Sequence, residues 1–234
     1  MRSHGVDVAI FAIAFALAGL VALALVWSGD WAYAMLASAT GNTHATFVAP
    51  PEARDVCGPE LAMDLSRLLE WHRHWVAYVI GIAGVPPGPA CSLFSSDEYR
   101  HMADVRNVFT GAELIGGLAA VIAAYRVWRG RRRGAALRVV RDGALLAAGL
   151  VAIVGVVAVL AFEPLFLLFH QVFFPQGNFL FDPATSNLVR LYPEWYWQGI
   201  TAGVGVSFIA LALVAAAGAQ VALRRASTTY TRAA

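Results

Sequence analysis

The sequence predicts an α-helical integral membrane protein with four transmembrane helices, a small mixed extracytoplasmic cap and both termini in the cytoplasm. Three observations predict this class: four long apolar runs nearly free of charge, arginine clusters at alternate junctions, and polar, aromatic-rich segments between runs. Each run approaches or exceeds the roughly 20 residues that cross a hydrocarbon core about 30 Å thick. Only helices and closed barrels satisfy the backbone there, and these runs are too long for barrel strands. We therefore expect a single membrane domain over residues 1–234.

The apolar runs place the spans at about residues 8–28, 107–128, 142–169 and 197–223. A cleaved signal peptide is the alternative for the first span. Its apolar run is longer than the roughly 7–15 residues of a signal core, so we expect a retained helix.

Basic residues gather before the first span, between the second and third spans, and after the fourth. The positive-inside rule places all three clusters in the cytoplasm. Topology thus accounts for the basic residues, and the net charge of +2 predicts no nucleic-acid partner. Binding of anionic lipid is the alternative. The basic residues are Arg2, Arg126, Arg129, Arg131, Arg132, Arg133, Arg138, Arg141, Arg224, Arg225 and Arg232.

Residues 30–106 and 170–196 then face outward and form the cap. In the first segment, apolar side chains recur at helical spacing and predict an amphipathic helix over about 59–80. Ser95 and Glu98 form a capping-box pattern, which predicts the start of a helix that continues into the second span. In the second segment, Asp182–Thr185 is a turn signal.

Two short strands, 178–181 and 188–192, are expected to flank this turn as a hairpin. The two cysteines, Cys57 and Cys91, both lie in the cap, where they can oxidise. A bridge between them would close about 35 residues and contribute roughly 3–4 kcal/mol. Two free, buried thiols are the alternative, and the absence of Cys-x-x-Cys argues against a thiol-redox enzyme.

Two of the six histidines, His101 and His170, stand beside the outer ends of the second and third spans. Both could therefore meet at one depth. Glu98 and Asp104 each lie three residues from His101 and share its helix face. A carboxylate there can fix the tautomer of an imidazole and raise its basicity. No histidine spacing supports zinc, so we predict no metal.

Other polar residues leave alternatives open. His72 and His74 lie on the amphipathic cap helix, where solvated or interfacial positions are expected. Glu113 and Glu163 lie inside apolar segments, where a carboxyl is costly and serves either helix packing or a site. A membrane binding or transport protein that uses both glutamates is one alternative function. A four-helix haem or quinone redox protein is another, although no histidine lies deep in a span.

Two blocks resemble the signature blocks of the lipoprotein intramolecular transacylase family of bacterial membrane proteins. They are SSDEYRHMADVR at 95–106 and FHQVFFPQGNFLFDPATSNLVRLYPEWYW at 169–197. The four-span plan and the two-part cap extend the resemblance over most of the chain. The matching residues are Glu98, His101, Met102, Asp104, Val105, His170, Phe174, Pro175, Gly177, Phe181, Asp182, Pro183, Leu188, Pro193, Glu194 and Trp197.

The resemblance implies an acyltransferase of the bacterial cytoplasmic membrane, with its active site at the extracytoplasmic face. Its partners would be diacylated lipoproteins and membrane lipid. The enzyme would move the sn-2 acyl chain of a diacylglyceryl-cysteine onto the free α-amine of that cysteine, giving the lyso-form lipoprotein. Amine attack closes a medium ring, so an aromatic pocket that folds the substrate would lower the barrier through orientation. No cofactor is required.

On this hypothesis His101 and His170 are the acid–base pair. Glu98 or Asp104 would orient His101, and Asn178 or Arg190 would stabilise the tetrahedral oxyanion. Asp182 and Glu194 would support the site or cap the hairpin and the fourth span. The aromatic pocket would contain Phe173, Phe174, Tyr192 and Trp197.

Overall fold

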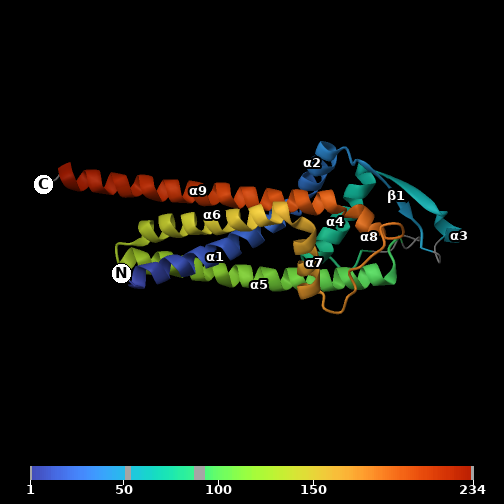
Figure 1. The fold of residues 1–234 in the computed structure, drawn as a ribbon, viewed down its shortest axis with the longest axis horizontal. Helices are drawn as coiled ribbons and strands as arrows, with labels where there is room; N and C mark the ends of the chain where they lie inside the picture. Colours follow the sequence, from blue (N-terminus) through green and yellow to red (C-terminus); the bar gives the residue numbers. More distant parts are fainter. Residues whose placement is uncertain (1, 51–53, 87–92, 233–234) are drawn as a thin grey trace. The chain divides into compact units, whose positions relative to one another are not determined.

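The computed structural model describes residues 2–50, 54–86 and 93–232 (Figure 1). Four of its helices are long and apolar enough to cross a membrane, as the sequence predicts: His4–Trp27, Ser96–Arg132, Ala136–Leu160 and Glu194–Ser227. The elements, in order, are α1 (Arg2–Trp27), α2 (Asp30–Thr40), β1 (His44–Val48), α3 (Arg54–Cys57), β2 (Glu60–Asp64), α4 (Leu65–Val79), α5 (Ser96–Arg132), α6 (Ala136–Leu160), α7 (Phe162–Phe173), α8 (Asn187–Leu191) and α9 (Glu194–Arg232).

The chain forms two compact units. Unit 1 contains Met1–Ala24, Ala112–Leu160 and Ala202–Ala234, which are parts of α1, α5 and α9 together with all of α6. Unit 2 contains Leu25–Gly111 and Ala161–Thr201. These two segments include the stretches that the sequence assigns to the cap, and each is somewhat longer than expected.

Small residues let the helices of unit 1 approach closely. Gly143 on α6 lies against the ring of Phe11 on α1, and Gly19 on α1 lies against the ring of Phe208 on α9. Phe208 is fully buried. Packing of this kind holds apolar helices together where no hydrophobic effect acts between them. Buried alanines complete this core: Ala12, Ala144, Ala147, Ala148, Ala212 and Ala216.

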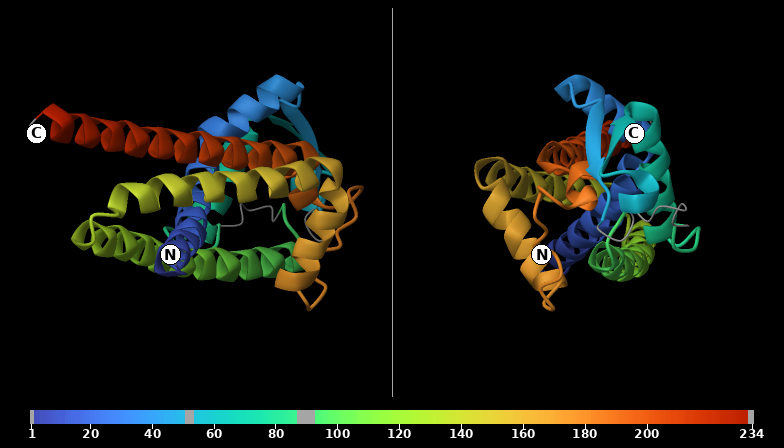
Figure 2. Two further views of the ribbon diagram at one scale, coloured as in Figure 1. Left: turned by 60° about the vertical axis from the view of Figure 1, so that its left-hand side comes forward. Right: turned by 90° about the vertical axis from the view of Figure 1, so that its right-hand side faces the viewer.

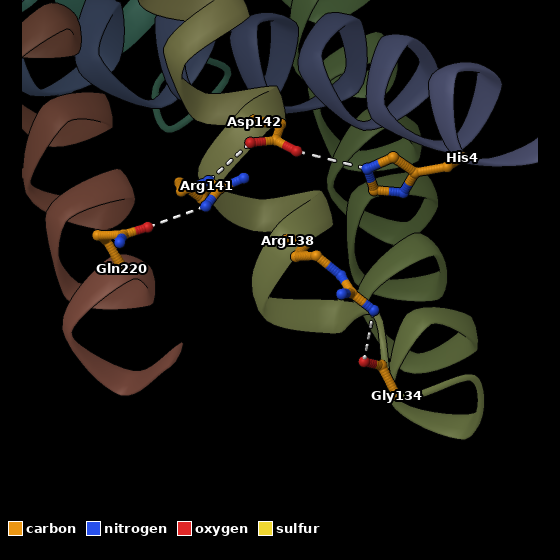
Figure 3. Close-up of polar contacts among 6 residues, drawn as sticks. All are labelled: His4, Gly134, Arg138, Arg141, Asp142 and Gln220. Atoms are coloured by element: carbon orange, nitrogen blue, oxygen red, sulfur yellow. Dashed lines mark hydrogen bonds and ion pairs between the residues drawn. The ribbon is translucent and has the colours of Figure 1, made fainter. Parts of the chain in front are cut away.

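Arginines tie the helices of unit 1 together near one end. Arg126 on α5 contacts Asp7 on α1 at 2.8 Å, and both side chains are largely buried. Figure 3 shows a second group, in which Arg141 donates to Asp142 at 2.7 Å and to Gln220 of α9 at 2.9 Å. Asp142 also contacts His4 at 3.4 Å (Figure 3). Arginines that the sequence analysis attributed to membrane topology therefore also join α1, α5, α6 and α9.

Unit 2 contains a two-stranded antiparallel sheet, in which β1 pairs with β2 from His44↔Asp64 to Val48↔Glu60. Helix α4 follows β2 directly, and Asp64 caps it by accepting a hydrogen bond from the backbone N–H of Arg67 at 2.9 Å. The strands and α4 lie together in both sets of views (Figures 1 and 2). The buried side chains of α4 follow the spacing of one helix face. They are Leu68, His72, Trp75, Tyr78 and Val79.

The predicted capping box is confirmed. The Ser95 hydroxyl accepts from the backbone N–H of Glu98 at 3.2 Å, and the Glu98 carboxylate accepts from the backbone N–H of Ser95 at 2.7 Å. Helix α5 begins at Ser96, directly after Ser95, and Glu98 lies in its first turn.

Two expected helix boundaries are wrong. The amphipathic helix expected over 59–80 begins only at Leu65, because Glu60–Asp64 pairs with β1 as a strand. The helix expected over 142–169 ends at Leu160. The backbone leaves the helical region at Ala161 (φ −143°, ψ 47°), and α7 begins at Phe162.

The predicted hairpin in the second cap segment is also wrong. Residues 178–181 form no strand, and Asn187–Leu191 is the short helix α8. The Ser186 hydroxyl starts this helix by accepting from the backbone N–H of Val189 at 3.2 Å. The turn itself is confirmed, because Thr185 donates its N–H to the Asp182 carbonyl at 3.0 Å. The predicted disulfide lies outside the described residues, which exclude Cys91 and the side chain of Cys57.

Candidate functional site

His101 and His170 come together in unit 2. Their ring centroids are 6.2 Å apart and their planes are inclined by only 16°. His101 lies on the second turn of α5 and is 7% exposed, whereas His170 lies near the end of α7 and is half-buried. The two histidines that the sequence selects are thus neighbours, although 68 residues separate them in the chain.

One hydrogen bond sets the tautomer of His170. Its Nδ1 lies 2.7 Å from the carbonyl oxygen of Phe166, one helical turn earlier. Because a carbonyl only accepts, Nδ1 carries the proton and Nε2 keeps its lone pair. Burial lowers the pKa of His170 below its usual value, and the Phe166 carbonyl opposes this shift more weakly. His170 is therefore a neutral imidazole with Nε2 ready to accept a proton.

Phenylalanine rings enclose the histidine pair. Phe174 is 2% exposed and contacts both imidazoles, with centroid distances of 4.7 Å to His101 and 5.5 Å to His170. Phe166 and Phe179 lie 4.3 Å and 5.3 Å from the His170 ring. An apolar wall of this kind strengthens hydrogen bonds and charges that form inside it.

The four predicted pocket residues differ in their positions. Phe174 contacts both histidines, and Trp197 lies one ring further out, 5.9 Å from Phe166. Phe173 is 49% exposed and contacts Phe169, and Tyr192 contacts Trp197 and His72. The predicted pocket omitted four rings that contact a site histidine. They are Phe166, Phe169, Phe179 and Phe181.

Asp104 holds the loop that follows α7. Its Oδ2 accepts from the side-chain amides of Gln176 at 2.7 Å and Asn178 at 2.6 Å. Since a carboxylate only accepts, the Asn178 nitrogen faces Asp104 and its Oδ1 points elsewhere. Asn178 was expected to donate to an oxyanion, but its amide nitrogen is committed to Asp104 in this structure.

Glu98 accepts hydrogen bonds from α8 and from its own helix cap. Its carboxylate is 3% exposed and accepts from the Ser186 hydroxyl at 2.6 Å and from the Leu188 backbone N–H at 2.8 Å. Together with the bond to Ser95, these contacts fasten α8 to the start of α5. The Glu98 carboxylate thus binds α8 and the helix cap in this structure, and its expected role in orienting His101 stays a prediction.

Three further predicted residues make local structural contacts. Arg190 donates to the carbonyl oxygens of Pro183, Ala184 and Thr46, which joins the turn to β1. Its expected role as an oxyanion donor stays a prediction. Asp182 accepts from the backbone N–H of Ala184 at 2.9 Å within the turn. Glu194 stands in the first turn of α9 and accepts from Gln198 at 2.6 Å.

The expectation that His72 is solvated or interfacial is wrong, because His72 is fully buried. Its Nε2 donates to the Ser28 carbonyl at 3.0 Å, and its Nδ1 accepts from the Tyr192 hydroxyl at 3.2 Å. Burial lowers its pKa to about 4. The signal was in the sequence, since His72 falls on the same helix face as Leu68 and Trp75.

The acidic and metal-binding alternatives gain no support from the geometry. Glu113 is half-buried in unit 1, whereas Glu163 is exposed in the first turn of α7 in unit 2. Among residues 2–50, 54–86 and 93–232, no group of three or more His, Cys, Asp or Glu side chains could hold a metal ion.

Solved structures share this fold. The membrane-integral lipoprotein intramolecular transacylase Lit from Bacillus cereus is 14% identical, with a TM-score of 0.73, covering 100% of this chain and 99% of that one. A histidine-to-alanine variant of the same protein gives a TM-score of 0.74 at 13% identity, covering 97% of this chain and 96% of that one. A histidine-to-arginine variant gives 0.72 at 16% identity, covering 97% and 94%.

Sequence comparison identifies the family. No curated protein matches the chain. The model of the lipoprotein intramolecular transacylase Lit family matches residues 60–197, a range that includes both histidines and more than half of the sequence. The chain therefore belongs to the lipoprotein intramolecular transacylase family.

Proposed function

We propose that this transacylase moves the sn-2 acyl chain of a diacylglyceryl-cysteine lipoprotein onto the α-amine of the same cysteine, with His101 and His170 as acid and base. The enzyme class follows from the family, which favours acyl transfer over the transport and redox alternatives. The observation that carries the histidine assignment is the pair of near-parallel imidazoles, 6.2 Å apart, inside a phenylalanine pocket.

The reaction requires two proton transfers away from nitrogen. The substrate amine enters as an ammonium group, since an α-amine has a pKa of about 7.7–8.0. His101 takes the first proton, and the free amine attacks the acyl carbon to form the C–N bond. His170 Nε2 takes the second proton from the tetrahedral intermediate. The bond from carbon to the glyceryl oxygen then breaks while His101 returns its proton to that oxygen.

The proton count closes without a metal, a nucleotide or an external acyl donor. One proton ends on the glyceryl hydroxyl, and the one on His170 leaves to solvent. Both products stay on one molecule, so its mass is unchanged. The aromatic pocket contributes by holding amine and ester together, because closure of the medium ring is otherwise entropically poor.

We further propose that the arginine-rich end of the helices faces the cytoplasm of a bacterial cytoplasmic membrane, with both termini there. The positive-inside rule supports this topology. His101 and His170 stand on the chain segments beside the opposite ends of the spans, so the site would lie at the extracytoplasmic face.

An isotope label tests the proposed transfer. Purified enzyme in detergent is given a diacylglyceryl lipopeptide with a deuterated acyl chain at sn-2 and an ordinary chain at sn-1. Fragmentation mass spectrometry should find the deuterated chain on the α-amine, with the mass of the whole molecule unchanged. Deuterium that appears on the amine of an added unlabelled lipopeptide would overturn the intramolecular assignment, and an ordinary chain on the amine would overturn the sn-2 assignment.

A further inference from the structure

Two buried polar atoms beside the histidine pair lack a partner. His101 Nδ1 and Asn178 Oδ1 are both buried and neither has a hydrogen bond within the described part of the chain. Burial and the neighbouring His170 lower the pKa of His101 to about 4, and the side chains of Asp104 and Asn178 oppose this shift. A buried donor or acceptor without a partner destabilises the fold, which favours a hydrogen bond between these two atoms.

A hydrogen bond to Asp104 sets the orientation of the Asn178 amide. Its Nδ2 donates to Asp104 at 2.6 Å, and this bond is possible only with the nitrogen toward the carboxylate. The amide oxygen is therefore held away from Asp104, on the side that can receive a proton donor. Gln176 donates to the same oxygen of Asp104 at 2.7 Å from the exposed side.

We propose that Asp104 and Asn178 form a positioning relay, in which the Asn178 amide oxygen accepts the Nδ1 proton of His101. The relay deepens the proposed function and rests on it. It gives His101 the same tautomer as His170, with the proton on Nδ1 and the lone pair on Nε2. The two acceptors differ in kind, because His170 uses the Phe166 carbonyl whereas His101 is linked through one amide to a carboxylate.

This difference divides the two roles. Burial disfavours a positive charge on His101, and a carboxylate linked to it through the Asn178 amide offsets part of that cost. His101 is thus suited to hold the first proton until the glyceryl oxygen leaves. His170 is suited to take the second proton during the attack. Asp104 and Asn178 touch neither reacting atom in this account and are positioning residues.

Nitrogen NMR of histidine-labelled enzyme tests the relay directly in the resting protein. The His101 signal is identified by its loss in His101→Gln. Wild type should show His101 with the proton on Nδ1. Asn178→Ala should shift His101 toward the tautomer with the proton on Nε2, and the rate of product formation should fall by about tenfold to a hundredfold, less than the roughly 10²–10⁴-fold expected for loss of an acid–base group.

Gln176→Ala is the matched control, because Gln176 binds the same Asp104 oxygen and has no bond to His101. It should leave the tautomer unchanged and the rate within about twofold of wild type. The double variant Asp104→Asn with Asn178→Asp exchanges the two side chains. The amide at position 104 can then donate to the carboxylate at position 178, and that carboxylate can accept from His101. The swap should recover the Nδ1 tautomer that Asn178→Ala loses.

Two results would overturn the relay. One is an Asn178→Ala enzyme whose His101 tautomer and rate match wild type. The other is an Asn178→Ala enzyme with a higher KM but an unchanged kcat and His101 tautomer, which would show that Asn178 contacts the substrate ammonium. Failure of the proposed histidine chemistry would be seen separately, as activity retained by His101→Gln. The tautomer is measured without substrate and does not depend on that result.

Discussion

His170 donates its Nδ1 proton to the carbonyl oxygen of Phe166, one turn earlier on α7, at 2.7 Å. The carbonyl orients the imidazole and leaves Nε2 as the atom that accepts a proton. Phe166 also packs its ring at 4.3 Å from the imidazole, so one residue fixes both the plane and the tautomer of the histidine. A base held in this way needs no reorganisation when the substrate arrives.

The pH dependence of kcat/KM should carry the signature of His170. Burial lowers the pKa of His170 below its ordinary value of about 6.5, so the neutral base persists into mildly acidic solution. We expect the rate limb due to this base to have its midpoint below about pH 6.5. Initial rates with a fixed lipopeptide between pH 4.5 and 8 would measure it. A base limb with its midpoint above pH 7 would contradict the environment described for His170.

His72 should make unit 2 less stable in acid. Its pKa is about 4 in the folded protein, against about 6.5 when unfolded, so the unfolded chain binds more protons between these values. Stability should therefore be complete above pH 6.5 and decline as pH falls toward 4, by roughly 3 kcal/mol over the whole window.

The variant His72→Gln isolates this effect, because glutamine does not titrate. The difference in unfolding temperature between wild type and variant should shrink as the pH is lowered from 7.5 to 4.5. Leu68→Ala provides the control, since it removes buried apolar contacts at every pH. A wild-type advantage over His72→Gln that stays constant with pH would contradict a neutral, buried His72.

Glu98→Gln should destabilise unit 2 although it preserves shape. Glu98 accepts from Ser95, Ser186 and Leu188. An amide nitrogen cannot accept, so at least one of these donors loses its partner. Since hydrogen bonds to a charged group contribute about 1.5–3 kcal/mol each, we expect a loss of roughly 2–4 kcal/mol.

Thermal unfolding in detergent measures the loss, and limited proteolysis should show earlier cleavage near α8. Glu194→Gln is the matched exposed control, with an expected change within about 0.5 kcal/mol. Equal unfolding temperatures for the two variants would contradict the tether between α8 and the start of α5.

Gly143→Ala should disturb the packing of unit 1. The added methyl group would lie inside van der Waals contact of the Phe11 ring, and Phe11 is buried. Overpacking of this kind costs about 1–3 kcal/mol. Gly149→Ala on the same helix meets no atom within 4 Å and should be neutral or stabilise by up to about 1 kcal/mol. Unfolding temperatures that fall equally in both variants would contradict the close crossing of α1 and α6.

The sequence predicted the class, the helices and the histidine pair because each has a local signal. The length of each apolar run predicts a membrane span, and the capping box of Ser95 and Glu98 predicts the start of α5. His101 and His170 could be paired because helices that cross a membrane bring their ends to common depths. The buried position of His72 also had a local signal, in its spacing from Leu68 and Trp75, but a general expectation about histidines on cap helices outweighed it.

Other features depend on contacts that no local pattern carries. The break at Ala161 is an exception with a local signal, because Pro164 has no N–H to donate to the Leu160 carbonyl, but the apolar residues around it outweighed this signal. The five-residue strands β1 and β2 stabilise each other through their pairing. The residues of β2 were assigned to the helix because their apolar side chains continue the helical spacing of α4. The hydrogen bond from Asn178 to Asp104 joins residues far apart in the chain, so no local pattern could predict that the amide nitrogen faces this carboxylate.

The most direct test of the acid–base pair compares three variants by mass spectrometry of a reporter lipoprotein's N-terminal peptide. His101→Gln and His170→Gln should each reduce formation of the N-acyl, monoacylglyceryl peptide by about 10²–10⁴-fold, while His44→Gln, an exposed histidine on β1, should retain wild-type product. All three proteins should unfold at similar temperatures. Near-wild-type product from either folded His101→Gln or His170→Gln would contradict the assignment of that histidine.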